Sequence, residues 1–135
     1  MKTIFALKTK ISFDADVYES MEKKALELLS ATEASSKYTQ AVILRSAKGN
    51  DYGTVIPDVL SEERAEMESL LQKIRASKDG EIRFALCMWE DNCIDIPSAD
   101  FRKSLLSLNE NNSETILFVM TAEGVAGIKL QSTIK

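Results

Sequence analysis

The spacing of apolar residues along the chain predicts alternating strands and helices. Residues 3–13 alternate between apolar and polar positions, which indicates a first strand. Asp16 with Glu19 three residues later has the pattern of a capping box, which would begin a helix. The apolar residues that follow recur at helical spacing and would form its buried stripe: Tyr18, Met21, Ala25, Leu28 and Leu29.

Residues 38–80 predict a second unit, consisting of two strands and a helix. Residues 41–44 are apolar on both faces, as in a central strand, and a turn-rich segment separates them from a return strand that ends at Pro57. Ser61 is the predicted N-cap of the helix, and Gly80 is the predicted left-handed residue after its end. The buried stripe of this helix would be Met67, Leu70, Leu71 and Ile74.

Residues 82–96 predict a β-hairpin whose loop is residues 90–92. Asn92 tolerates the left-handed backbone that such a three-residue loop requires. In this register Cys87 faces Asp95, and Cys93 lies diagonally from Cys87. The diagonal separation is too long for an unstrained disulfide, so both thiols should be free.

The last part of the chain predicts a third helix and a second hairpin. Ser98 would cap the helix, residues 109–114 would form a solvated loop, and Gly124 would occupy the left-handed position of a three-residue hairpin loop. The helix stripe would be Phe101, Leu105 and Leu108. This hairpin register would place six apolar residues on one face: Ile116, Phe118, Met120, Ala126, Ile128 and Leu130. The other face is also fairly apolar, so the hairpin should be central or covered on both sides.

The predicted order of elements is β-α-β-β-α-β-β-α-β-β, an α+β fold in one domain over residues 1–135. After the first strand, a helix followed by a hairpin occurs three times, and the first six elements match the ferredoxin-like order. We expect a mostly antiparallel sheet of six to seven strands, with three helices mainly on one face. The other face would be partly exposed or buried against a second subunit.

Composition limits the compartment and the partners. The chain has 135 residues, of which 44% are hydrophobic, and a net charge of −4, whereas nucleic-acid binding favours a basic face. The first apolar run, residues 4–7, is too short for a signal peptide, and no run is long enough for a membrane helix. We therefore expect a cytoplasmic protein that binds neither nucleic acid nor membrane.

The absence of histidine removes several catalytic chemistries. It excludes Ser-His-Asp and Cys-His catalysis as well as zinc held by histidine. Cys87 and Cys93 supply neither four zinc ligands nor a C-x-x-C redox motif. The acidic residues at positions 62–68 are typical of a solvated helix face. We expect no metal, no cofactor and no catalytic residue, although an enzyme that depends on carboxylates is an alternative.

Trp89 is the candidate for partner recognition. It would lie on the hairpin face opposite the main apolar one, and an exposed aromatic residue among charged side chains is typical of protein interfaces. If a helix or the first strand covers this face, Trp89 is structural instead. The predicted partner-binding residues are Trp89, Glu90, Asp91, Arg83 and Asp95.

Together these patterns favour a non-catalytic intracellular binding protein, such as an inhibitor, a toxin-neutralising immunity-type protein or an adaptor. The acidic residues near Trp89 would suit another protein with a basic surface. Two alternatives stay open. One is a homodimeric domain that self-associates and holds a small ligand, and the other is the carboxylate-dependent enzyme.

Overall fold

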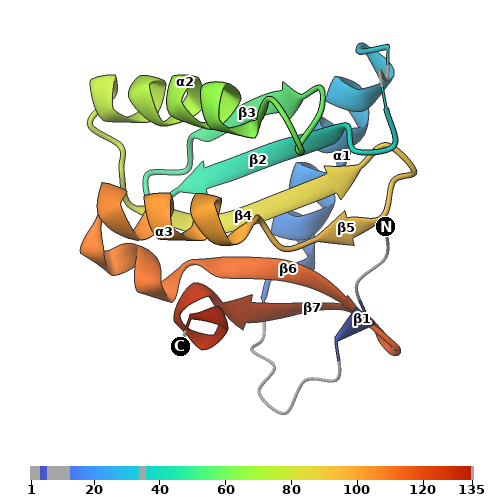
Figure 1. Cartoon of the computed structure of the whole chain (residues 1–135). Coiled ribbons are helices and arrows are strands. Elements are labelled where there is room, and N and C mark those ends of the chain that lie inside the picture. The colour runs from blue at the N-terminus through green and yellow to red at the C-terminus, as the bar shows by residue number, and fades with distance from the viewer. Residues whose placement is uncertain (1–3, 6–12, 34–35, 135) are drawn as a thin grey trace.

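Three helices pack against one mixed sheet in the computed structural model, which describes residues 4–5, 13–33 and 36–134 (Figure 1). The helices are α1 (Ala15–Ser30), α2 (Glu63–Ala76) and α3 (Ala99–Leu108). The strands are β1 (Ile4–Phe5), β2 (Gln40–Ser46), β3 (Asp51–Ile56), β4 (Ile82–Trp89), β5 (Ile94–Asp95), β6 (Ile116–Thr121) and β7 (Gly124–Lys129). Two short 3-10 helices, Glu110–Glu114 and Leu130–Thr133, follow α3 and β7. The α+β class and the order of helices and strands are confirmed.

The sheet is mostly antiparallel, as predicted. Its order is β1-β6-β4-β2-β3, with β5 added to β4 and β7 added to β6, which makes seven strands among the described residues. The parallel pairs are β4 with β6 and β1 with β6, and the other pairs are antiparallel. Because β4 lies between β2 and β6, it is a central strand.

Helices cover both faces of the sheet. Helices α2 and α3 lie on one face, as predicted for most of the helices, and α1 lies on the other (Figure 1). On the α2–α3 side the core includes Val42, Cys87, Leu71 and Phe101. On the α1 side it includes Met21, Ile43, Met88 and Phe118. The face expected to be open is therefore covered by α1, and self-association of the chain stays a prediction.

The hairpin of β4 and β5 has the predicted register. Cys87 pairs with Asp95 and Met88 pairs with Ile94. Asn92 takes the left-handed conformation, with φ of 69°. Cys87 and Cys93 form no disulfide with each other, as the diagonal placement predicted.

The register predicted for the last hairpin is wrong. Thr121 pairs with Gly124, so the turn has two residues between them and not three. Ala126 and Ile128 therefore lie on the face of Leu117 and Val119, away from Phe118. A change of one residue in register moves every side chain of a strand to the opposite face. Both faces of the hairpin are nevertheless covered, as expected.

Helix ends differ from the predictions by a few residues. Asp14, and not Asp16, is the N-cap of α1, and its carboxylate accepts a hydrogen bond from the backbone of Asp16. The N-cap of α2 is Glu62 in place of Ser61, and its side chain makes no capping bond. After α2, the left-handed residue is Lys78, with φ of 52°, in place of Gly80. The prediction of Ser98 as the cap of α3 is confirmed.

The segment after α3 is more ordered than predicted. The residues expected to form a solvated loop include a 3-10 helix, and Asn112 within it is fully buried. Of the predicted first strand, residue 3 and residues 6–12 lie outside the described residues. None of the helices in the described ranges combines the length and the apolar content needed to cross a membrane.

Candidate functional site between α2 and α3

Trp89 does not form an exposed recognition surface. Only 6% of Trp89 and 8% of Asp95 is exposed to solvent. Trp89 lies two residues after Cys87 on β4, so the two side chains are on the same face of the sheet, and Cys87 faces the core beneath α2 and α3. The indole Nε1 of Trp89 donates a hydrogen bond of 3.2 Å to Asp95 Oδ2. The helices that cover this face explain why the exposure expected for an aromatic anchor is absent.

The remaining predicted partner residues do not gather around Trp89. Glu90 and Asp91 are exposed in the β4–β5 turn, where Asp91 Oδ1 accepts a hydrogen bond of 3.0 Å from the backbone of Cys93. Arg83 lies near the opposite end of β4, about 20 Å from Trp89 at the usual rise of a strand. There it forms an ion pair of 3.2 Å with Glu81. These five residues do not make one surface, and whether any of them binds a partner is untested.

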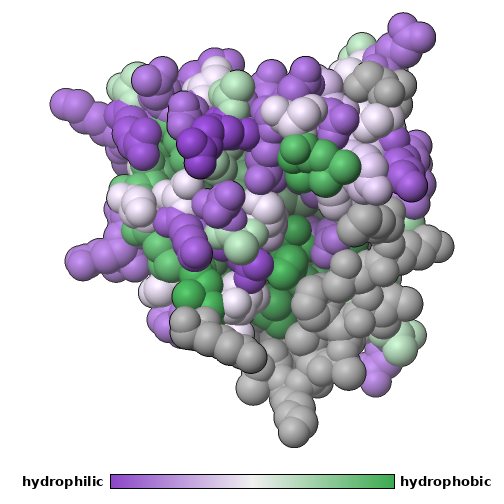
Figure 2. Space-filling model, in the orientation of Figure 1, coloured by the Kyte–Doolittle hydropathy of each residue, from purple (hydrophilic) through white to green (hydrophobic). Residues whose placement is uncertain are grey.

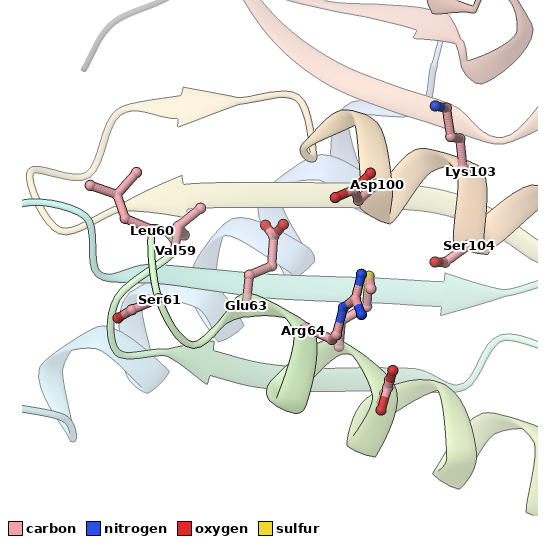
Figure 3. Close-up of a pocket in the computed structure, with 10 residues that line it drawn as sticks. Val59, Leu60, Ser61, Glu63, Arg64, Asp100, Lys103 and Ser104 are labelled. Carbon is pink, nitrogen blue, oxygen red and sulfur yellow. The ribbon is translucent and has the colours of Figure 1, made fainter.

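A cavity lies instead between the first turns of α2 and α3 (Figure 3). Its volume is about 580 Å³, within the range of small-molecule sites. The lining comes from the loop before α2, from the first two turns of α2 and from α3: Val59, Leu60, Ser61, Glu63, Arg64, Met67, Glu68, Asp100, Lys103 and Ser104.

Glu63 is the distinctive residue of this cavity. It is the first residue of α2, and its Oε1 accepts a hydrogen bond of 2.7 Å from the hydroxyl of Ser98, the N-cap of α3. Its other oxygen, Oε2, is buried, and it is the one buried side-chain oxygen or nitrogen among the described residues that has no hydrogen-bond partner. A buried polar atom without a partner is destabilising by about 1–3 kcal/mol, so such atoms are rare in folded proteins.

The charges around Glu63 have both signs. In Figure 3, Glu63 and Arg64 project from the start of α2 toward α3, which contributes Asp100 and Lys103. The N-terminus of α2 has no side-chain cap, and the N-termini of helices carry partial positive charge. The cavity therefore offers hydrogen-bond donors and acceptors to one polar molecule.

Leu60 adds an apolar side chain at the edge of the cavity. Leu60 is 71% exposed to solvent, and Leu26, the other large hydrophobic residue exposed in the described structure, is 38% exposed. The space-filling view shows a hydrophobic patch over the loop that leads into α2 (Figure 2). An exposed apolar residue beside polar groups would suit a ligand with an apolar face.

Cys87 lies near the acidic groups of the site but is not a reactive thiol. It is fully buried, and burial, together with the negative charges of Asp95 and Glu63, raises the pKa of the thiol far above its usual range. The thiolate is the form of cysteine that acts as a nucleophile and binds metals. Cys87 therefore stays protonated at neutral pH and is inert.

Comparison with known proteins identifies the fold. No protein-family model matches the sequence, and neither does any curated protein. Cytidine deaminase from Mycobacterium tuberculosis matches with a TM-score of 0.64 and 11% identity, over 90% of this chain and 95% of that one. The enzyme from Mycobacterium leprae matches with a TM-score of 0.61 and 15% identity, over 87% and 96%. The chain has the fold of the cytidine deaminases. Identities this low establish the fold alone.

The residues of this chain do not fit the metal of zinc deaminases. Those enzymes bind zinc through His/Cys/Cys or three cysteines in an H-x-E and P-C-x-x-C signature. Here α2 begins with Glu63-Arg64-Ala65-Glu66, and Pro97 is followed by Ser98 and then, three residues later, by Phe101. The described residues include no group of three or more His, Cys, Asp or Glu that could hold a metal ion. The positions outside the description are of other residue types.

This fold corrects the functional prediction. An inhibitor, an immunity-type protein or an adaptor was the expectation from the sequence, and it is wrong: the structural neighbours are enzymes. The buried Trp89 also removes the exposed aromatic residue on which that expectation depended. The alternative of an enzyme agrees better with the fold.

Sequence reasoning identified Ser98 as a helix cap and placed Glu63 among the acidic residues of a solvated helix face, but it did not predict their contact. The two residues are 35 positions apart, so only the packing of α2 beside α3 brings them together. The available signal was that two helices, each with acidic residues in its first turn, follow strands of the same sheet. That signal predicts neither the cavity nor the unpaired oxygen.

Proposed function

We propose that the cavity between α2 and α3 is the active site of a carboxylate-dependent enzyme, with a small polar molecule as substrate and Glu63 as the acid–base group. The observation that carries this proposal is the buried, unpaired Oε2 of Glu63 in the lining of the cavity. A substrate that donates a hydrogen bond to this oxygen would satisfy it. The fold shared with cytidine deaminases supports an enzyme over a purely structural domain.

The lining indicates the chemistry of the substrate. It should carry an N–H or O–H group for Oε2 of Glu63, and an acceptor or anionic group for Arg64 or Lys103. A planar or otherwise apolar face would contact Leu60. A cavity of about 580 Å³ is large enough for a molecule the size of a nucleoside.

Glu63 is held in one orientation by the rest of the site. The hydroxyl of Ser98 fixes Oε1, and Ser98 is itself fixed because its Oγ accepts a hydrogen bond of 3.1 Å from the backbone of Phe101. This arrangement leaves Oε2 as the atom that would accept a proton from the substrate or from a bound water. A base must be within hydrogen-bond reach of the proton that it removes, and a fixed carboxylate meets this requirement without reorganisation.

Cytidine is the first probe, because it is the substrate named for the structural neighbours and because its amino group is an N–H donor. Titration of ¹⁵N-labelled protein with cytidine should shift the amide signals of the first turns of α2 and α3 in a saturable way. Glu63→Gln should weaken this binding by about tenfold or more, since a hydrogen bond to a charged group contributes about 1.5–3 kcal/mol. Proton spectra of the same mixtures over a day would report any chemical conversion.

Two matched controls make this test specific. Glu68→Gln changes another carboxylate of the same cavity and should alter binding by no more than about threefold, a typical effect of an exposed charge. N4,N4-dimethylcytidine has no N–H on its base and should bind far more weakly than cytidine. The proposal fails if Glu63→Gln binds cytidine as tightly as the parent, or if neither cytidine nor other amine-bearing compounds shift the signals of the site.

A cytoplasmic location is part of the same proposal. Cys87 and Cys93 form no disulfide with each other, and reducing compartments keep thiols in that state.

A further inference from the structure

Two segments of this chain, at the starts of α2 and α3, can be compared with the zinc signature of deaminases, and in both of them the ligand residues are different. In the P-C-x-x-C pattern, this chain keeps Pro97 and has Ser98 and Phe101 where the two cysteines would stand. In the H-x-E pattern, Arg64-Ala65-Glu66 keeps only the glutamate. The chain thus shares the fold of the deaminases, but these two segments hold none of the signature's histidine or cysteine ligands.

A hydrogen bond between two side chains joins the N-terminus of α2 to the N-terminus of α3. The hydroxyl of Ser98 donates to Oε1 of Glu63 at 2.7 Å and accepts from the backbone of Phe101 at 3.1 Å. Ser98 therefore caps its own helix and binds the first residue of α2 at the same time. The side chain of Phe101 is fully buried in the hydrophobic core on the α2–α3 side of the sheet, where it packs against apolar residues.

The two cysteines cannot take over the role of ligands. Cys87 is buried in the core beneath the helices, where its raised pKa keeps it protonated. Cys93 lies beyond the β4–β5 turn, and the two thiols belong to no metal-binding group among residues 4–5, 13–33 and 36–134. The described part of the chain therefore brings together no set of three side chains that could hold zinc.

We infer that this chain works without the zinc of the deaminases whose fold it shares, and that the hydrogen bond between Ser98 and Glu63 links α2 to α3 without a metal. The inference does not depend on the substrate or on catalysis by Glu63. It implies that chelators leave the protein folded and that the link is broken by removing one hydroxyl group.

Metal analysis and thermal unfolding of the full chain test whether the protein holds zinc and whether its stability depends on a metal. The protein would be produced in zinc-supplemented medium, dialysed, and analysed for metal by mass spectrometry. We expect well below one zinc per chain, and the same melting temperature with EDTA, with added ZnCl₂ and with neither. One zinc retained per chain after dialysis, or a fall in melting temperature on chelation, would overturn the inference.

Substitution of Ser98 tests the bridge itself. Ser98→Ala should lower the melting temperature by about 3–6 °C, with or without EDTA, because it removes a helix cap and a contact between helices. Ser104→Ala is the matched control, a serine of the same helix and the same cavity, and should shift the melting temperature by less than about 1–2 °C. Equal effects of the two substitutions would show that Ser98 does not link the helices. The metal analysis gives its answer independently of either variant.

Discussion

Both ends of the α2–α3 layer bury polar side chains, but the hydrogen bonding of these side chains is complete at one end and incomplete at the other. At the C-terminal end, Asn112 is fully buried and makes three hydrogen bonds: it accepts from the backbone of Ile82 at 2.7 Å, and donates to Gly80 at 2.9 Å and to Leu105 at 2.8 Å. Nearby, the 3%-exposed Asp79 accepts from Asn50 at 2.9 Å and from Tyr52 at 2.8 Å.

At the N-terminal end, the hydrogen bonding is incomplete. Glu63 has one oxygen bound to Ser98 and the other buried without a partner, beside a cavity. Buried polar groups in folded proteins are almost always satisfied, and the C-terminal end follows that rule. The difference indicates that the C-terminal cluster stabilises the fold, and it supports our proposal that the N-terminal one binds a ligand.

The largest expected effect on stability is that of Asn112→Ala. This change leaves one backbone N–H and two carbonyl groups without partners in the interior, so the free energy of unfolding should fall by about 3–4 kcal/mol. Urea denaturation followed by circular dichroism at pH 7 would measure it. Asn111→Ala is the control, since Asn111 is exposed and its side chain donates a long hydrogen bond of 3.4 Å to Glu81; the change should alter stability by less than about 0.5 kcal/mol. A loss below 1 kcal/mol for Asn112→Ala would contradict the structural role of this end.

Asp79→Asn should have an intermediate and pH-dependent effect. Burial alone would raise the pKa of Asp79, but hydrogen bonds from Asn50, Ser46 and Tyr52 outweigh it and hold the pKa below its usual value. The contribution of the carboxylate to stability is then fully present above about pH 4–5, and it is lost as the pH falls through about 4 toward the folded-state pKa.

The loss caused by Asp79→Asn should therefore be about 2 kcal/mol at pH 7 and markedly smaller near pH 3, since hydrogen bonds to a charged group contribute about 1.5–3 kcal/mol. Urea denaturation of the parent and the variant at both pH values measures this difference. A loss of the same size at the two pH values would show that the ionised carboxylate contributes nothing specific.

The same comparison explains what the sequence could predict. The β4–β5 hairpin follows from local rules, because its turn residues and its alternation agree on one register. The last hairpin was predicted with a three-residue loop, and the observed pairing of Thr121 with Gly124 reverses the side-chain faces of β7. A local rule predicts a register well only when the length of the turn is unambiguous.

Polar residues at the ends of α2 and α3 were harder to predict, for a physical reason. Asn112 belongs to a polar segment that has the composition of a solvated loop, yet its partners lie on β4, on α3 and before β4, up to 32 positions away. Glu63 and Ser98 likewise meet only through helix packing. Single-sequence patterns report local periodicity, whereas the hydrogen-bond state of a buried group depends on contacts distant in sequence.

Among the three substitutions of buried polar groups, Glu63→Gln should have the smallest effect on stability, and it is the most informative. Glutamine keeps an oxygen for the hydroxyl of Ser98 and changes only the atom that has no partner, so the free energy of unfolding should stay within about 1 kcal/mol of the parent. Residues that serve function at the expense of stability are those whose replacement is tolerated or stabilising. Urea denaturation at pH 7 gives the value, to be set beside the loss for Asn112→Ala. If Glu63→Gln instead destabilised the protein by more than 2 kcal/mol, the carboxylate would be a structural group like Asp79, and the two ends of the layer would not differ in role.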